Sequence, residues 1–244
     1  MTSQSRHTLG ILRLEERLPP GSAPEPGSMS DPAMYDRPVI TETVEGAWAD
    51  IVIRGDTSLD SACIAAARRL VERGAVAITS NCGFFIRHQE AVAASVNVPV
   101  ALSSLLLVPT LLRQLPRAAK LAVVTADSTF CGYDLVGVAN PADRARVVIG
   151  GIESGKLLRH WLMHPGTPTE VGDLEVEVAA CVRQIRAAHP EIAALLFECT
   201  RFPAVAPAIR RLTNVPVYDI IDLCRMMITS IDWPATESGN AGDR

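Results

Sequence analysis

The sequence predicts an α/β fold with two pseudo-symmetric lobes, each a mostly parallel sheet flanked by helices and with the active site in the cleft between them. Short apolar runs alternate with helix-like segments, which is typical of parallel βαβ units. In addition, residues 75–100 match residues 192–217 at eight of 26 positions without a gap, at an offset of 117, which places Cys82 on Cys199. The repeat indicates either two similar βα units in one protein or a duplication that presents two thiols to a shared cleft.

The first half of the chain is divided by its apolar runs and turn residues. In order, the pattern predicts a strand at 8–14, a Pro- and Gly-rich loop at 19–38, strands at 39–44 and 50–54, a helix to about 73, a strand at 75–80, a helix at about 85–96, a strand at 98–100 and an apolar helix at 103–115. Ser58 or Asp60 is expected to cap the first helix, and Gly74 to end it. Pro109 is expected to kink or break the apolar helix.

The second half follows the same alternation. It predicts strands at 120–125 and 145–149 with short helices after each, a long helix at 169–188, a strand at 192–197, a resumed strand at 215–217 and a last helix at about 222–230. We divide the chain into lobe A (8–114 with 217–232) and lobe B (115–216). The ends, 1–7 and 235–244, are predicted to be disordered tails.

Composition narrows the class of protein. The net charge of −4 gives no basic surface for nucleic acid. No apolar stretch approaches the roughly 20 residues that span a bilayer, and the polar start has no signal core. Six cysteines without a CxxC pair do not form a disulfide or zinc framework. We therefore expect a cytoplasmic protein with free thiols and neither a nucleic-acid nor a membrane partner.

Each repeated cysteine follows a buried strand and precedes a helix. In parallel α/β sheets, ligands bind outside the carboxyl ends of the strands, so this placement puts Cys82 and Cys199 on the binding side. Cys63, Cys181 and Cys224 lie in helical patterns among apolar residues and are expected in the core. His160 and His164 are four residues apart, but no third donor completes a metal site, and we expect no metal.

The motifs around the two thiols resemble those of the aspartate/glutamate racemase superfamily. Cys199-Thr200-Arg201-Phe202-Pro203 is similar to its Cys-Thr-His-Tyr-Pro element, with Arg201 in place of His, and residues 79–84 resemble its first thiol loop. Residues 9–11, 125–127 and 151–153 fit its less-characterised racemase-like branch. The resemblance spans nearly the whole chain, and the presence of two cysteines differs from the decarboxylases of the superfamily, which keep one.

The resemblance implies a racemase or epimerase that needs neither pyridoxal phosphate nor metal and acts on a small carboxylate such as an aspartate- or glutamate-like amino acid. Cys82 and Cys199 would exchange the roles of base and acid on the two faces of the α-carbon. A homodimer is expected on the same ground. Asn81 precedes Cys82, whereas in glutamate racemases an Asn follows the first Cys, and their Asp-Ser-Gly element is absent here.

Polar groups beside the thiols are the candidate substrate-binding residues. Backbone N–H groups of the helix starts can stabilise an enediolate. The residues we assign to substrate binding are Ser80, Asn81, Gly83, Phe84, Thr200 and Arg201. Glu198 either points away from the site or binds a substrate ammonium, and in both cases the two thiols are expected to differ in pKa.

Other functions remain open from the sequence. Within the superfamily, these are hydantoin racemase, a cysteine-dependent cis-trans isomerase and a decarboxylase. From other classes, they are a non-catalytic small-molecule binder and a thiol redox sensor. The loop at 19–38 is either a lid or disordered.

Overall fold

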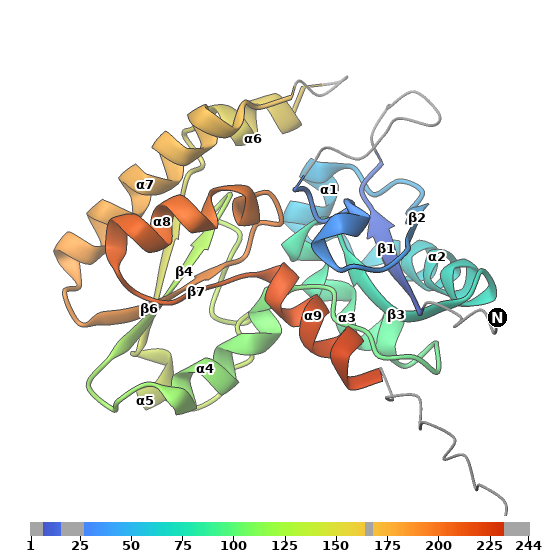
Figure 1. Ribbon diagram of the computed structural model, residues 1–244, viewed down its shortest axis with the longest axis horizontal. Coiled ribbons are helices and arrows are strands. Elements are labelled where there is room, and N and C mark those ends of the chain that lie inside the picture. Colours follow the sequence, from blue (N-terminus) through green and yellow to red (C-terminus); the bar gives the residue numbers. More distant parts are fainter. Residues whose placement is uncertain (1–6, 16–26, 164–167, 232–244) are drawn as a thin grey trace, which may run out of the picture.

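The computed structural model describes residues 7–15, 27–163 and 168–231. Its strands form two parallel sheets in separate halves of the molecule (Figure 1). The strands are β1 (Thr8–Arg13), β2 (Val39–Thr43), β3 (Ala75–Ser80), β4 (Lys120–Thr125), β5 (Val147–Gly151), β6 (Ile192–Phe197) and β7 (Val217–Tyr218). This arrangement confirms the predicted α/β class.

Helices connect the strands and cover both sheets. The α-helices are α1 (Ala49–Arg54), α2 (Asp60–Glu72), α3 (Gln89–Ala93), α4 (Val108–Gln114), α5 (Pro141–Arg144), α6 (Lys156–Trp161), α7 (Val171–Ala188), α8 (Ala206–Thr213) and α9 (Ile220–Ile231). The 3₁₀ helices are η1 (Pro32–Met34), η2 (Thr57–Leu59), η3 (Gly83–His88), η4 (Ser104–Leu107) and η5 (Phe202–Val205). None of the helices in the described ranges is long and apolar enough to cross a membrane.

The two sheets repeat each other in detail. Their orders are β2-β1-β3 and β5-β4-β6-β7, and a parallel bridge from Val100 to Ile78 puts a counterpart of β7 beside β3. The β1–β3 register shifts between Thr8 and Leu9, and the β4–β6 register shifts between Lys120 and Leu121. Because even this irregularity recurs, the repeat in the sequence corresponds to a duplicated sheet.

Each sheet is covered on one face by a helix that follows the strands of the other sheet. Helix α2 packs on β1, β2 and β3, and α9, which follows β7, packs beside β3 (Figure 1). In the second sheet, α7 packs on β4 and β5, while α4, from the first half of the chain, packs on β4. This exchange ties the two halves together.

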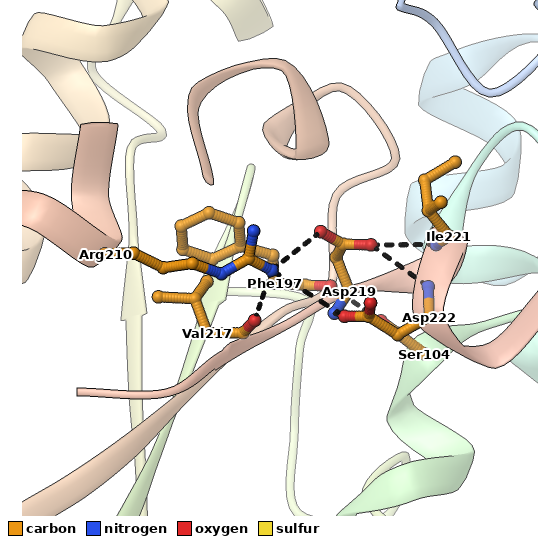
Figure 2. A network of polar contacts seen from close by, with 7 residues as sticks. All are labelled: Ser104, Phe197, Arg210, Val217, Asp219, Ile221 and Asp222. Atoms are coloured by element: carbon orange, nitrogen blue, oxygen red, sulfur yellow. Dashed lines mark hydrogen bonds and ion pairs between the residues drawn. The ribbon is translucent and has the colours of Figure 1, made fainter. Parts of the chain in front are cut away.

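A polar network holds the start of the exchanged helix α9 (Figure 2). Asp219 is 4% exposed, and its Oδ1 accepts hydrogen bonds from the backbone N–H groups of Ile221, at 2.8 Å, and Asp222, at 3.4 Å. Arg210 of α8 donates to the Val217 carbonyl at 2.6 Å and lies 3.9 Å from Asp219 Oδ2. These contacts fix α9 relative to α8 and β7.

One predicted strand was wrong, because residues 50–54 belong to helix α1. Its buried residues, Ala49, Val52 and Ile53, follow helical spacing. Gly55 ends the helix at φ +83°, a conformation that favours glycine. The apolar run 51–53 is therefore one face of a short helix.

Other boundaries differ by smaller amounts. Residues 98–100 contribute one bridge rather than a full strand, and the helix predicted at 85–96 starts as η3 and ends at Ala93. Pro109 lies in the first turn of α4, where proline needs no N–H donor. Residues 1–6 of the predicted N-terminal tail (1–7), the whole predicted C-terminal tail (235–244) and residues 19–26 of the predicted loop lie outside the described residues.

Candidate active site

Cys82 lies in a turn at the carboxyl end of β3. The chain leaves the strand with an N–H bond from Asn81 to the Leu12 carbonyl at 2.9 Å, and the Phe85 N–H then bonds back to the Cys82 carbonyl at 3.1 Å. Ser80 Oγ lies 2.8 Å from the Cys82 carbonyl oxygen and 2.6 Å from that of Leu102. Cys82 is 3% exposed and begins η3.

Cys199 occupies the equivalent turn after β6. The Glu198 N–H bonds to the Val124 carbonyl at 2.9 Å, and the Phe202 N–H bonds to the Cys199 carbonyl at 3.0 Å. Cys199 is also 3% exposed. The same two backbone bonds therefore fix both thiols, as expected from their places at strand ends.

The two thiol turns touch where the lobes meet. Thr200 Oγ1 donates to the Asn81 carbonyl at 2.5 Å. Gly83 is the residue equivalent to Thr200 in the first lobe. If Gly83 carried a side chain, its Cβ would lie 2.3 Å from the Glu198 carbonyl oxygen and 2.2 Å from Glu198 Oε1. Ser104 Oγ adds a 2.6 Å bond to the Phe197 carbonyl. Gly83 is thus required by the close approach of the Cys199 turn.

The surroundings of Cys199 favour the neutral thiol. Burial, followed by the Glu198 carboxylate and the Cys82 thiol, raises the pKa of Cys199 well above its usual value. The Arg201 backbone N–H, hydrogen-bonded to the thiol, and the Arg201 charge oppose this shift in pKa. Cys82 is among the groups that raise the pKa of Cys199, and the Thr200–Asn81 hydrogen bond joins the two turns that carry these thiols.

Glu198 points into the lobe boundary and is 1% exposed. Its Oε2 accepts from Thr125 Oγ1 at 2.8 Å, and the Ala126 N–H also bonds to the carboxyl. Burial raises the pKa of Glu198 to about 7 despite these bonds and the Arg87 charge. Oε1 has no hydrogen-bond partner among the described residues, so the carboxyl group is held in place but incompletely satisfied.

The residues predicted to bind substrate are divided between this boundary and the core. Asn81, Gly83 and Thr200 form the contacts between the turns. Phe84 is 2% exposed and packs in a core cluster that includes residues of both sheets. Arg201 is half-buried, with Nη2 3.5 Å from the Thr169 carbonyl oxygen.

Three neighbours of Glu198 are not among the catalytic and substrate-binding residues that we assign from the sequence. Thr125 holds the carboxyl, Cys131 lies near enough for Glu198 to raise its pKa, and Arg87 lowers the pKa of both groups. Thr125 ends β4, so its position beside Glu198 depends on strand order, which the sequence pattern does not specify. His160 bonds to Thr169 Oγ1 at 2.8 Å, and His164 lies outside the described residues.

Solved structures of low sequence identity share this fold. An aspartate racemase from Picrophilus torridus aligns with a TM-score of 0.57 over 92% of this chain and 93% of that chain, at 13% identity. A mutant of arylmalonate decarboxylase in a sulfate-associated form aligns with a TM-score of 0.55 over 93% and 94%, at 15% identity. The fold is therefore that of the aspartate/glutamate racemases and arylmalonate decarboxylase, as the thiol motifs predicted.

Sequence comparison identifies a different branch of this fold. No family model matches the chain. It is 31% identical over 221 residues to a dimethylsulfoniopropionate lyase of Durusdinium sp. clade D, across 88% of this chain and 71% of that protein. It is 29% identical to dimethylsulfoniopropionate lyase 3 of Emiliania huxleyi (strain CCMP1516), across 92% of this chain and 60% of that relative's length. The chain belongs to the dimethylsulfoniopropionate lyase family.

Proposed function

We propose that this chain is a cysteine-dependent lyase that eliminates dimethyl sulfide from dimethylsulfoniopropionate or a closely related sulfonium carboxylate. The observation that carries the proposal is a pair of buried thiols at equivalent strand ends, in two turns that touch, in a member of this family. Both the elimination and the racemisation predicted from the thiol motifs begin with removal of the weakly acidic proton next to a carboxylate. The lyase relatives favour elimination as the outcome.

The proposed elimination needs only one base, the Cys82 thiolate. The Cys82 thiolate takes the α-proton, the C–H electron pair forms the carbon–carbon double bond, and the carbon–sulfur bond breaks with its pair on sulfur. The products are acrylate, neutral dimethyl sulfide and the Cys82 thiol, which returns its proton to water. The sulfonium cation of the bound substrate itself favours the thiolate, since a nearby opposite charge lowers the pKa of an acid.

Cys199 has a complementary role in this proposal. As a neutral thiol, it can donate a hydrogen bond to the substrate carboxylate while negative charge develops there. The backbone N–H groups of Gly83 and Phe84, at the start of η3, are suited to the same charge. Arg201, whose charge acts on Cys199, is our choice of cation for the carboxylate.

Racemisation of a small carboxylate-bearing amino acid is the second candidate, and the duplicated thiols favour it. A substrate without a leaving group on its β-carbon would stop at the enediolate, and the opposite thiol could protonate the other face. In that case, both cysteines would be indispensable to equal degrees.

Cysteine variants test the lyase proposal. Wild type should release dimethyl sulfide from dimethylsulfoniopropionate, measured by gas chromatography, and Cys82→Ser should lose at least about 100-fold of the rate, as expected for a proton-transfer group. Cys199→Ser should lose less. Cys181→Ser is the matched control, because Cys181 packs in the second core between α7 and β5, and it should keep the wild-type rate. Full activity in Cys82→Ser would refute the assignment.

A further inference from the structure

Asn81 and Glu198 occupy equivalent positions in the two lobes. Each precedes a thiol, and each donates its N–H to the neighbouring central strand, at Leu12 and Val124. The Asn81 side chain accepts the Leu14 N–H at 2.8 Å, as the Glu198 side chain accepts the Ala126 N–H. The two side chains therefore perform the same structural task, closing the end of the adjacent strand.

Asn81 is neutral and Glu198 can carry a negative charge, but closing the end of a strand does not require a charged side chain. An amide satisfies the position in the first lobe. The second lobe instead buries an ionisable carboxyl against Gly83, and its Oε1 has no hydrogen-bond partner in the described part of the chain. Burying such a group is costly unless it is paired. Since an amide would close the strand equally well, the carboxyl needs another explanation.

We propose that Glu198 makes the two thiols unequal: its carboxyl, held between the Cys199 turn and Gly83, disfavours the Cys199 thiolate and leaves Cys82 to take the substrate proton. Glu198 is thus a positioning residue that sets the division of labour within the proposed lyase reaction, on which this inference rests. Asn81, being neutral, imposes no such penalty on Cys82.

The charges around Glu198 are consistent with this role. Besides Cys199, the ionisable groups that interact with it are Cys131 from the segment after β4 and Arg87 from η3, and the carboxyl lies against Gly83, the residue that follows Cys82. Arg201 and Cys82 act on Cys199. The carboxyl ionises at a pH below that of an ordinary thiol, whose pKa is about 8.5, so it is already an anion where Cys199 would lose its proton.

The test is a titration of individual thiols by NMR, using cysteine labelled with ¹³C at Cβ and assigned with single Cys→Ser variants. In Glu198→Gln, the Cys199 titration midpoint should fall, giving about tenfold more Cys199 thiolate at a fixed pH, while that of Cys82 moves less. The charge-swapped variant Asn81→Asp/Glu198→Gln should raise the Cys82 midpoint instead.

An unchanged Cys199 midpoint in Glu198→Gln, or an equal shift of both thiols, would overturn the proposal. If Glu198→Gln does not fold, the same titration is carried out on the single variant Asn81→Asp. A raised titration midpoint of the Cys82 thiol then supports the proposal, and an unchanged midpoint contradicts it. The titration needs no substrate. A failure of wild type to release dimethyl sulfide would therefore reject the proposed function separately from the result on Glu198.

Discussion

At the scale of single residues, Glu198 links protonation to the stability of the fold. Its pKa of about 7 in the folded chain lies above the usual 4.5, so the folded state binds this proton more tightly than the unfolded state. The stability that goes with the neutral carboxyl is present in full below about pH 4.5 and is lost as the pH rises through about 7.

Glu198→Gln should remove this pH dependence, because glutamine mimics the neutral acid. Between about pH 5 and pH 8, wild type should lose stability relative to the variant by an amount on the order of 3 kcal/mol. Urea unfolding at several pH values measures the difference. A wild-type-minus-variant difference that stays constant across this range would show that the carboxyl does not titrate in the folded chain.

Gly83→Ala should damage both the site and the fold. The new Cβ would lie within 2.3 Å of the Glu198 carbonyl oxygen, so the two thiol turns must move apart. Overpacking of this kind costs about 1–3 kcal/mol, and lyase activity should fall as the thiols separate. Gly172→Ala is the control, because a Cβ there meets nothing within 4 Å. Wild-type activity in Gly83→Ala would contradict the close approach.

At the scale of elements, the exchanged helices make each sheet depend on the other half of the chain. Helix α9 completes the core around β1 and β3 with Ile220, Ile221 and Cys224, although it follows the second sheet in sequence. Helix α4, from the first half of the chain, packs in turn on β4 of the second sheet. Each sheet therefore relies on a helix from the other half of the chain to cover one of its faces.

Ile221→Ala should therefore destabilise the whole molecule. Ile221 is 3% exposed, whereas Met226 on the same helix is 57% exposed. The first change should cost about 2–5 kcal/mol, and Met226→Ala should cost less than about 0.5 kcal/mol. Circular dichroism in urea measures both. Equal effects of the two variants would contradict the packing of α9.

The sequence was sufficient for the elements with strong local patterns. The strands at β1, β3, β4 and β6 and the helix α7 are buried runs or long periodic segments, and the thiol positions follow from strand ends. At α1, the three consecutive apolar residues 51–53 resemble a short strand, although Gly55 is placed to end a helix. A short apolar run does not distinguish the two structures.

The contacts between elements distant in sequence could not be predicted in the same way. Thr125 meets Glu198 because β4 and β6 are neighbours in the second sheet, and Ser104 meets Phe197 because η4 of the first half lies against β6. The internal repeat showed that Asn81 and Glu198 correspond, but their shared role in closing a strand depends on register. The racemase motifs predicted the fold correctly, while the relatives found by sequence are lyases.

At the scale of the whole molecule, the duplicated lobes provide two thiols at one shared boundary, where the preceding residue is neutral Asn81 for one thiol and ionisable Glu198 for the other. The backbone holds the two thiols in equivalent positions, while the charges next to them differ. This combination suits the proposed lyase reaction, which needs one cysteine as a base and the other as a neutral hydrogen-bond donor. If the exchanged helices couple the lobes as described, heat or urea should unfold both sheets in a single transition. Two separate transitions, seen by calorimetry, would show independent lobes.

The most direct measurement follows the fate of dimethylsulfoniopropionate in deuterated buffer by proton NMR. If Cys82 removes the α-proton and elimination follows, acrylate and dimethyl sulfide should appear in equal amounts with wild type and be absent with Cys82→Ser. Deuterium incorporation into intact substrate without acrylate, or an amino acid from a panel exchanging its α-proton while dimethylsulfoniopropionate stays unchanged, would contradict elimination and favour racemisation.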